Sequence, residues 1–284
     1  MRRQHIFVNF KRFDVPASLG GVNRGDVSGW AERIISGTLP GLSAYDSESV
    51  RFAMYFPESQ LFGALGALGS SDRIEIGCQG VCRSDVSKGG NFGAFTTLRP
   101  AAAMAAMGVR SAIIGHCEER NGMRALLETA GVTCFSCISR VLNEEVLCAQ
   151  SRGMSVLYCV GERADEVGDW DKVITAQLRD GLAGADLSSV TVAYEPVWSI
   201  GPGKTPAGKE YITKVARLIK DTLGDVPVVY GGGLKEENAE MLASISEIDG
   251  GLVALTRFTG EIGFYCDEFL NIVRLYLGRK QEEN

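Results

Sequence analysis

Short apolar, β-branched segments alternate with longer amphipathic segments along almost the whole chain. The short segments predict strands, because buried parallel strands are runs of about 4–8 largely apolar residues. The expected strands are residues 6–10, 50–56, 73–78, 111–115, 155–160, 190–194, 226–230 and 249–253. The longer segments predict helices at residues 30–36, 60–68, 141–151, 172–182, 208–223, 236–245 and 264–277.

This alternation indicates repeated β/α units around a parallel sheet. Eight strands fit a closed barrel better than an open doubly wound sheet, whose strand count is usually lower. A chain of 284 residues suits such a barrel, which typically has about 250 residues in one domain, and no low-complexity linker divides it. The predicted architecture is an α/β fold, a (β/α)8 barrel of the TIM-barrel type, with residues 1–284 as a single domain.

The connections carry two further signals. Glycine directly follows several helical segments, where a left-handed C-terminal residue costs glycine little. These glycines are Gly37, Gly69, Gly108, Gly153 and Gly224. Residues 11–26, 79–97 and 121–139 are long for plain connections, and long loops commonly cover a site or reach another subunit.

Composition and charge narrow the function classes. A 45% hydrophobic and 23% charged chain has the balance of an ordinary globular protein. The net charge of −6, without a basic run longer than a pair, argues against a nucleic-acid surface, which needs clustered Lys and Arg. No apolar run reaches the roughly 18 residues that cross a bilayer, and the N-terminus has no apolar signal core. We therefore expect a cytoplasmic protein with no nucleic-acid or membrane partner.

The eight cysteines lie among mainly apolar neighbours, and a non-secreted chain of this size rarely depends on disulfides. The pair Cys134 and Cys137 has the spacing of half a zinc site. No second pair matches it, and the only histidines are His5 and His116. We expect free thiols, no metal and no cofactor.

Polar side chains follow the first and fourth expected strands, at the barrel end where active residues gather. Asn9 and Lys11 follow the first strand, and His116 and Glu118 the fourth. A lysine at this position can stabilise negative charge, and an asparagine amide can orient the lysine or a ligand. The alternative for Lys11 is a solvated surface residue, as most lysines are. If the residues after His116 open a helix, the positive end of the helix dipole keeps the imidazole neutral, and the neutral ring can donate a hydrogen bond to a carbonyl. The alternative is a buried, hydrogen-bonded structural histidine.

Glu195 directly follows the sixth expected strand, and Pro196 stops that strand. The carboxylate is therefore expected at the barrel mouth, where partial burial makes it a better base. The Gly-rich residues 199–206 can close over a ligand, with backbone amides such as that of Gly201 free to meet phosphate oxygens, but many Gly-rich loops are only turns.

Seven motifs together resemble the triosephosphate isomerase family, in family order along nearly the whole chain. They are NFK at residues 9–11, GAFT at 93–96, IIGHCEER at 113–120, CVGE at 159–162, AYEPVWSIGPGKTP at 193–206, YGGG at 230–233 and DGGLV at 249–253. The AYEPVW segment with its following loop is the most specific of them. The resemblance implies the same barrel and an aldose–ketose isomerase.

The roles implied by the resemblance are specific to single residues. Glu195 would move a proton between adjacent carbons, and His116 would be the neutral group that polarises the carbonyl, as in the family's known mechanism. Lys11 would hold substrate charge, with Asn9 and Glu118 as supporting site residues.

The resemblance also implies that residues 196–205 form a lid that keeps water from the enediolate. A small phosphorylated sugar would be the substrate.

Departures from the family pattern concentrate at the expected phosphate site. Gly233 replaces the family's serine after the YGG turn, and Ala254 and Leu255 stand where the family has a glycine pair. Backbone amides survive such changes, but Leu255 adds bulk and restricts φ, so we expect a reshaped phosphate pocket. Arg257 can bind phosphate in two points, although an arginine near a helix start is as often a surface ion pair.

Smaller departures are Cys117 for the usual serine, Leu98 for the glutamate of GAFTGE, and Pro206 for the alanine that ends the lid. The loop before residue 93 is longer than the family's, and in the family this loop makes the dimer contact. We still expect a homodimer.

Three functions follow from these observations. The default is interconversion of the triose phosphates, dihydroxyacetone phosphate and glyceraldehyde 3-phosphate. A four-carbon ketose phosphate of the erythrulose type is the second substrate candidate. A non-catalytic barrel that binds an effector is the alternative from another class, and the complete set of Lys11, His116 and Glu195 argues against it.

Overall fold

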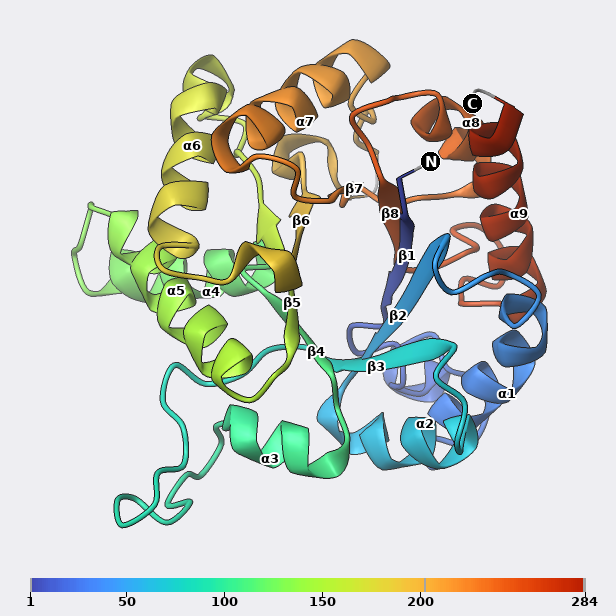
Figure 1. The fold of residues 1–284 in the computed structure, drawn as a ribbon, viewed down its shortest axis with the longest axis horizontal. Coiled ribbons are helices and arrows are strands. Elements are labelled where there is room, and N and C mark those ends of the chain that lie inside the picture. Colours follow the sequence, from blue (N-terminus) through green and yellow to red (C-terminus); the bar gives the residue numbers. More distant parts are fainter. Residues whose placement is uncertain (1, 202, 283–284) are drawn as a thin grey trace.

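The computed structural model of the chain describes residues 2–201 and 203–282. Its strands form a closed barrel in which each strand pairs in parallel with the next and β8 pairs with β1 (Figure 1). The strands are β1 (Gln4–Asn9), β2 (Val50–Phe56), β3 (Ile74–Cys78), β4 (Ser111–Ile114), β5 (Ser155–Val160), β6 (Val190–Tyr194), β7 (Val228–Tyr230) and β8 (Gly250–Val253). The predicted α/β barrel is confirmed, and each strand boundary lies within two residues of the expected one.

Helices surround the barrel and cover its outer face (Figure 1). They are α1 (Trp30–Leu42), α2 (Leu61–Leu68), α3 (Ala101–Met107), α4 (Cys117–Thr129), α5 (Ser136–Ser151), α6 (Trp170–Gly181), α7 (Lys209–Leu223), α8 (Ala239–Ala243) and α9 (Cys266–Glu282). In α7 the buried residues Ile212, Val215, Ala216 and Ile219 recur at the spacing of one helix face. This spacing explains why the amphipathic segments form the outer layer.

The barrel interior is a packed core rather than a pore. One or two side chains from most of the strands point inward, and together they fill the interior. The buried interior residues are Phe7, Ala53, Tyr55, Ile113, Leu157, Cys159, Ala193, Val229 and Leu252. This rigid interior fixes the positions at which the strands end.

Two helices were not expected from the sequence. The segment Ala101–Met107 forms α3, which ends at Gly108 in a left-handed conformation. Residues 121–139, expected as a long loop, contain most of α4 and the start of α5, so that expectation was wrong. Residues 79–97, by contrast, contain no helix or strand and form a projecting loop (Figure 1).

The expectation that Gly37 ends the first helix was also wrong, because α1 continues to Leu42. A Cβ atom at Gly37 would lie 2.8 Å from the sulfur of Cys266, and one at Gly41 would lie 2.7 Å from Leu270. These glycines therefore allow α9 to approach α1 closely. The other glycines expected at helix ends do have positive φ angles.

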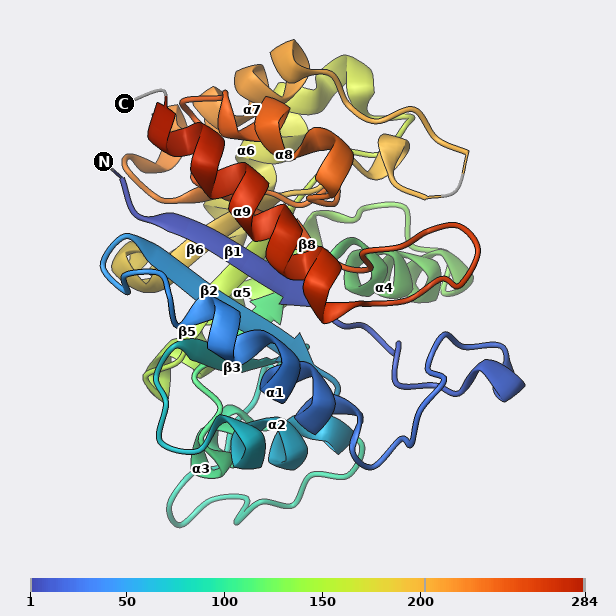
Figure 2. The same cartoon turned by 90° about the vertical axis from the view of Figure 1, so that its right-hand side faces the viewer.

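The barrel has two functionally different ends. The loops after β1 and β8 lie at the same end as α4, and the described chain ends in β1 and α9 lie at the other (Figure 2). Since the strands are parallel, all their C-terminal ends meet at the first of these ends. Among the described residues, no helix is long and apolar enough to span a membrane.

Candidate active site

The end of β1 places a lysine in a strained but well-supported conformation. Lys11 has a φ angle of +42°, in the left-handed region that non-glycine residues rarely adopt. The Oδ1 atom of Asn9 accepts a hydrogen bond from the Lys11 backbone N–H at 3.0 Å, and Gln79 Nε2 donates to the Lys11 carbonyl at 2.8 Å. The Lys11 ammonium donates to Oε1 of Glu118 at 2.7 Å. The cation is therefore held across the barrel mouth, toward the end of β4.

The end of β4 presents His116 as the N-cap of helix α4. Its Nδ1 atom accepts a hydrogen bond from the Glu118 backbone N–H at 3.3 Å. A ring nitrogen that accepts carries no proton, so this geometry places the imidazole proton on Nε2 and leaves the ring neutral. The residues after His116 do open a helix, which is the condition under which the imidazole was expected to stay neutral.

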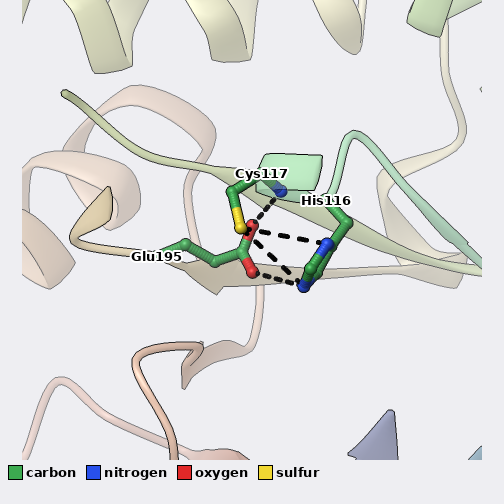
Figure 3. Close-up of side chains that lie close together, drawn as sticks. All are labelled: His116, Cys117 and Glu195. Atoms are coloured by element: carbon green, nitrogen blue, oxygen red, sulfur yellow. Dashed lines mark hydrogen bonds and ion pairs between the residues drawn. The ribbon is translucent and has the colours of Figure 1, made fainter. Parts of the chain in front are cut away.

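Glu195 lies directly after β6 and is only 2% exposed. Its Oε1 atom lies 3.1 Å from Nε2 of His116, and its Oε2 atom accepts a hydrogen bond from the Cys117 backbone N–H at 2.8 Å (Figure 3). Burial raises the pKa of Glu195, while His116 and the Cys117 N–H act in the opposite direction. The net effect is a carboxylate that binds a proton more readily than a solvated one.

The glycine after β7, Gly231, leaves room for this carboxylate. A Cβ atom at Gly231 would lie 2.7 Å from Cγ of Glu195. Any side chain at this position would displace Glu195, so the glycine of the YGGG motif leaves room for the carboxylate.

The first residues after Glu195 are anchored to a buried carboxylate. Oε1 of Glu162 accepts hydrogen bonds from Trp198 Nε1 at 2.6 Å, Tyr194 OH at 2.9 Å and Tyr211 OH at 3.1 Å. Ser199 is still buried, and the described segment becomes exposed only at Gly201, which has a φ angle of +118°. Pro202 of the expected lid lies outside the described residues.

The expected phosphate site lies at the neighbouring ends of β7 and β8. Gly233 has a φ angle of +100°, and the backbone N–H of Leu234 donates to the carbonyl of Leu252, which joins the two strand ends. Ala254 directly follows β8, and Leu255 is largely buried at 7% exposed.

Arg257 is engaged in an ion pair. Its guanidinium donates to Glu268, through Nε at 2.9 Å, and lies over the ring of Tyr265 at 4.0 Å. Of the two roles that the sequence allowed for Arg257, phosphate binding or a surface ion pair, the structure shows the ion pair.

A cavity of about 270 Å³ lies beside the catalytic candidates. Cys117 and Glu195 line it together with residues of α4, α5 and α6, such as Arg120, Arg124 and Gln177, and with residues that follow β5 and β6. The carboxylate of Glu195 therefore borders open space.

Sequence reasoning missed Gln79 and Glu162 as site residues. Gln79 directly follows β3, so the rule that located Lys11 and His116 would have located it as well. Glu162 stands two residues after β5, within the CVGE motif.

The comparison with protein families agrees with this geometry. The model of the family described as triosephosphate isomerase matches residues 40–275. The chain belongs to the triosephosphate isomerase family.

Individual family members give the degree of similarity. The chain is 31% identical to the triosephosphate isomerase of Prochlorococcus marinus strain SARG over 227 residues, which are 78% of this chain and 85% of that protein. It is 38% identical to the triosephosphate isomerases of P. marinus strain MIT 9301 and of Chlorobium phaeobacteroides, each over 57% of this chain. These two matches span less than two thirds of those proteins, 63% and 64%.

A solved structure of the triosephosphate isomerase from Bartonella henselae superimposes with a TM-score of 0.69 at 24% identity, over 97% of this chain and 99% of that one. This similarity supports the triosephosphate isomerase fold over nearly the whole length.

Proposed function

We propose that the chain is an aldose–ketose isomerase that interconverts dihydroxyacetone phosphate and glyceraldehyde 3-phosphate through an enediolate. The observation that carries the proposal is the meeting of Lys11, His116 and Glu195 at one end of the barrel, from the ends of β1, β4 and β6. A carboxylate, a neutral N–H donor and a fixed cation are the groups that proton transfer next to a carbonyl requires.

In this proposal Glu195 removes a proton from the carbon next to the substrate carbonyl. The electron pair moves onto the carbonyl oxygen, which becomes the enediolate oxygen and accepts a hydrogen bond from Nε2–H of His116. Glu195 then returns the proton to the former carbonyl carbon, while the hydroxyl proton of the neighbouring carbon passes to the enediolate oxygen, so the new carbonyl forms there and the reaction consumes no other reagent. In the structure that Nε2 atom faces Oε1 of Glu195 at 3.1 Å, and the substrate oxygen would take the place of this carboxylate oxygen.

Lys11 would supply fixed positive charge toward the substrate's negative end. Asn9 supports it by accepting the Lys11 backbone N–H, and Glu118 by pairing with its ammonium. Charge that is already in place requires no reorganisation during the reaction, which makes such groups effective.

The phosphate group would meet backbone amides at the lid and at the ends of β7 and β8. Gly201 belongs to residues 196–205, the proposed lid, and Gly233, Ala254 and Leu255 stand at the strand ends. The pairing of Arg257 with Glu268 favours backbone amides rather than this guanidinium as the phosphate ligands.

A four-carbon ketose phosphate is the second candidate substrate. The observation in its favour is that Ala254 and Leu255 replace a glycine pair, because added side chains displace whatever binds against the backbone. A barrel that binds an effector without catalysis is the remaining alternative.

We further propose that the protein is a homodimer that uses the loop of residues 79–97. Phe92 near its tip is 83% exposed, a large apolar side chain that gains free energy when a second subunit covers it. Arg152 anchors the loop by donating to Asp85 at 2.5 Å.

A coupled assay of the purified chain with glyceraldehyde 3-phosphate and with erythrulose phosphates, alongside Glu195→Gln, tests the proposal. Fast triose turnover that the variant loses supports triosephosphate isomerase activity. Turnover of the longer sugars alone would replace it with the second candidate. No turnover of either, together with no thermal stabilisation by enediolate mimics, would leave the effector-binding alternative.

A further inference from the structure

Three potential metal ligands of different chemistry meet at the barrel mouth. A ring nitrogen of His116, the sulfur of Cys117 and a carboxylate oxygen of Glu195 all lie within 4.8 Å of one another (Figure 3). The Cys117 sulfur lies 4.0 Å from Nε2 of His116, and this Nε2 lies 3.1 Å from Oε1 of Glu195.

These distances are close to those of a tetrahedral zinc centre. With metal–ligand bonds of about 2.0–2.3 Å, the ligand atoms of such a centre lie roughly 3.3–3.7 Å apart. The two distances to Nε2, 3.1 and 4.0 Å, bracket this range, and the sulfur and the carboxylate oxygen lie within 4.8 Å of each other, so side-chain rotations that bring these two atoms closer would place all three around one ion.

The chemistry of the set selects a thiophilic cation. Imidazole, thiolate and carboxylate are the ligand types that zinc takes, whereas Mg²⁺ and Ca²⁺ take oxygen. The sulfur comes from Cys117, which stands where the family pattern has a serine, and a serine hydroxyl is not among the usual ligands of zinc.

A carboxylate also stands behind the histidine. Oε2 of Glu118 lies 3.7 Å from Nδ1 of His116, while its Oε1 pairs with Lys11. When a metal occupies Nε2, the imidazole proton resides on Nδ1, so the Glu118 backbone N–H gives up its hydrogen bond to Nδ1 and the nearby Glu118 carboxylate accepts the Nδ1 proton instead. The pairing of Lys11 with Glu118 also reduces the repulsion between the ammonium and an incoming cation.

The site is accessible and leaves one coordination position open. Cys117 and Glu195 are among the residues that line the cavity of about 270 Å³, and the side chain of His116 is 12% exposed. Three protein ligands leave the fourth tetrahedral position for water or another small ligand.

We propose that His116, Cys117 and Glu195 bind one thiophilic divalent cation, such as Zn²⁺ or Cd²⁺. A metal–sulfur bond replaces the S–H bond of Cys117, whose proton passes to solvent, and the imidazole proton moves from Nε2 to Nδ1. No electron is transferred. Occupation of the site engages the proposed base and the proposed electrophile together, so the cation inhibits the isomerase. Only this last consequence rests on the proposed function.

The test is a titration of the full chain with Cd²⁺, followed by the ultraviolet thiolate-to-cadmium charge-transfer band and by calorimetry. Cys134 is exposed, and with Cys137 it offers Cd²⁺ a competing thiol pair, so the parent protein is Cys134→Ser/Cys137→Ser. We expect one equivalent to bind with the band of a single thiolate. Adding Cys117→Ser should abolish the band and raise the Kd more than about tenfold, since even an outer partner of a metal ligand is worth about 10–100-fold.

The matched control adds Cys148→Ser, a partly buried thiol on α5, and the band should persist. A band that survives Cys117→Ser, or its absence in the parent, would overturn the site, with far-UV circular dichroism showing that Cys117→Ser is folded.

Inhibition separates the two proposals. If the chain isomerises no sugar phosphate but shows the Cys117-dependent band, only the proposed function fails. If it is active, unaffected by Cd²⁺ and without the band, only the metal site fails.

Discussion

Nε2 of His116 lies 3.1 Å from Oε1 of Glu195, so the two groups proposed as electrophile and base face each other directly. The substrate must therefore replace each as the partner of the other. This arrangement fixes the relative positions of the two side chains.

Glu195→Gln should lower kcat by roughly 10²–10⁴-fold or more, because the amide keeps the shape of the side chain but cannot accept the proton. The amide oxygen can still accept the Cys117 N–H, so the far-UV circular dichroism spectrum and the thermal midpoint should change little. Steady-state kinetics with glyceraldehyde 3-phosphate measures the effect. Near-normal turnover would refute the assignment of Glu195 as the base.

His116 has two separable tasks, helix capping and catalysis. His116→Asn should retain stability, since asparagine is a good N-cap, but it should lose most of the turnover because its amide is a differently placed donor. His116→Ala should lose turnover and also about 1 kcal/mol of stability, the usual cost of a missing cap. Kinetics and urea unfolding of both variants separate the two tasks. Equal stability of both would show that the cap contributes nothing.

Arg257→Ala should leave kcat and KM nearly unchanged, because the guanidinium is already paired with Glu268 and the side chain is 40% exposed. Glu268→Ala is the matched control, since it frees the same arginine. Each change should leave the thermal midpoint nearly unchanged, because exposed ion pairs contribute little to stability. An increase in KM in Arg257→Ala alone would instead make Arg257 a phosphate ligand.

His5 should make the stability fall in acid. Burial, with smaller contributions from Arg51 and other cations, lowers the pKa of His5 to about 3, below its usual 6.5. The folded state then binds fewer protons than the unfolded state between these values, so this contribution to stability is complete above pH 6.5 and is lost as the pH falls toward 3. The slope is about 1.4 kcal/mol per pH unit.

Urea unfolding of the wild type and His5→Gln at pH 7 and pH 4.5 tests this. The wild type should lose about 2–3 kcal/mol more than the variant, whose amide does not titrate. Parallel losses would show that other groups dominate the acid sensitivity.

Strand positions could be read from the sequence because a buried parallel strand is apolar on both faces. Helices were harder to predict where a segment has few apolar positions or no polar face, because an amphipathic helix is recognised by the contrast between its two faces. The segment that forms α4 is polar overall and buries only Cys117, so few apolar core positions mark it, and α3 consists of alanines and methionines without a polar face. For α3 the high helix propensity of alanine was the overlooked signal.

The candidate site residues could be located because strand ends determine which residues meet at the barrel mouth. The hydrogen-bond partners of these residues could not be predicted, because contacts such as that of Lys11 with Glu118 join residues far apart in the chain and depend on side-chain rotamers. The same applies to the proposed cation site. The expectation of no metal rested on the Cys134–Cys137 pair, whereas the proposed ligands become neighbours only when β4 and β6 close into one barrel.

The placement of the described chain ends at the far end of the barrel has a practical consequence. A fused domain, an affinity tag or a covalent tether attached there would extend away from Lys11, His116 and Glu195 (Figure 2). The protein could therefore be immobilised on a sensor surface through either end with the barrel mouth facing solution, which allows Cd²⁺ and sugar phosphates to be assayed on the same surface.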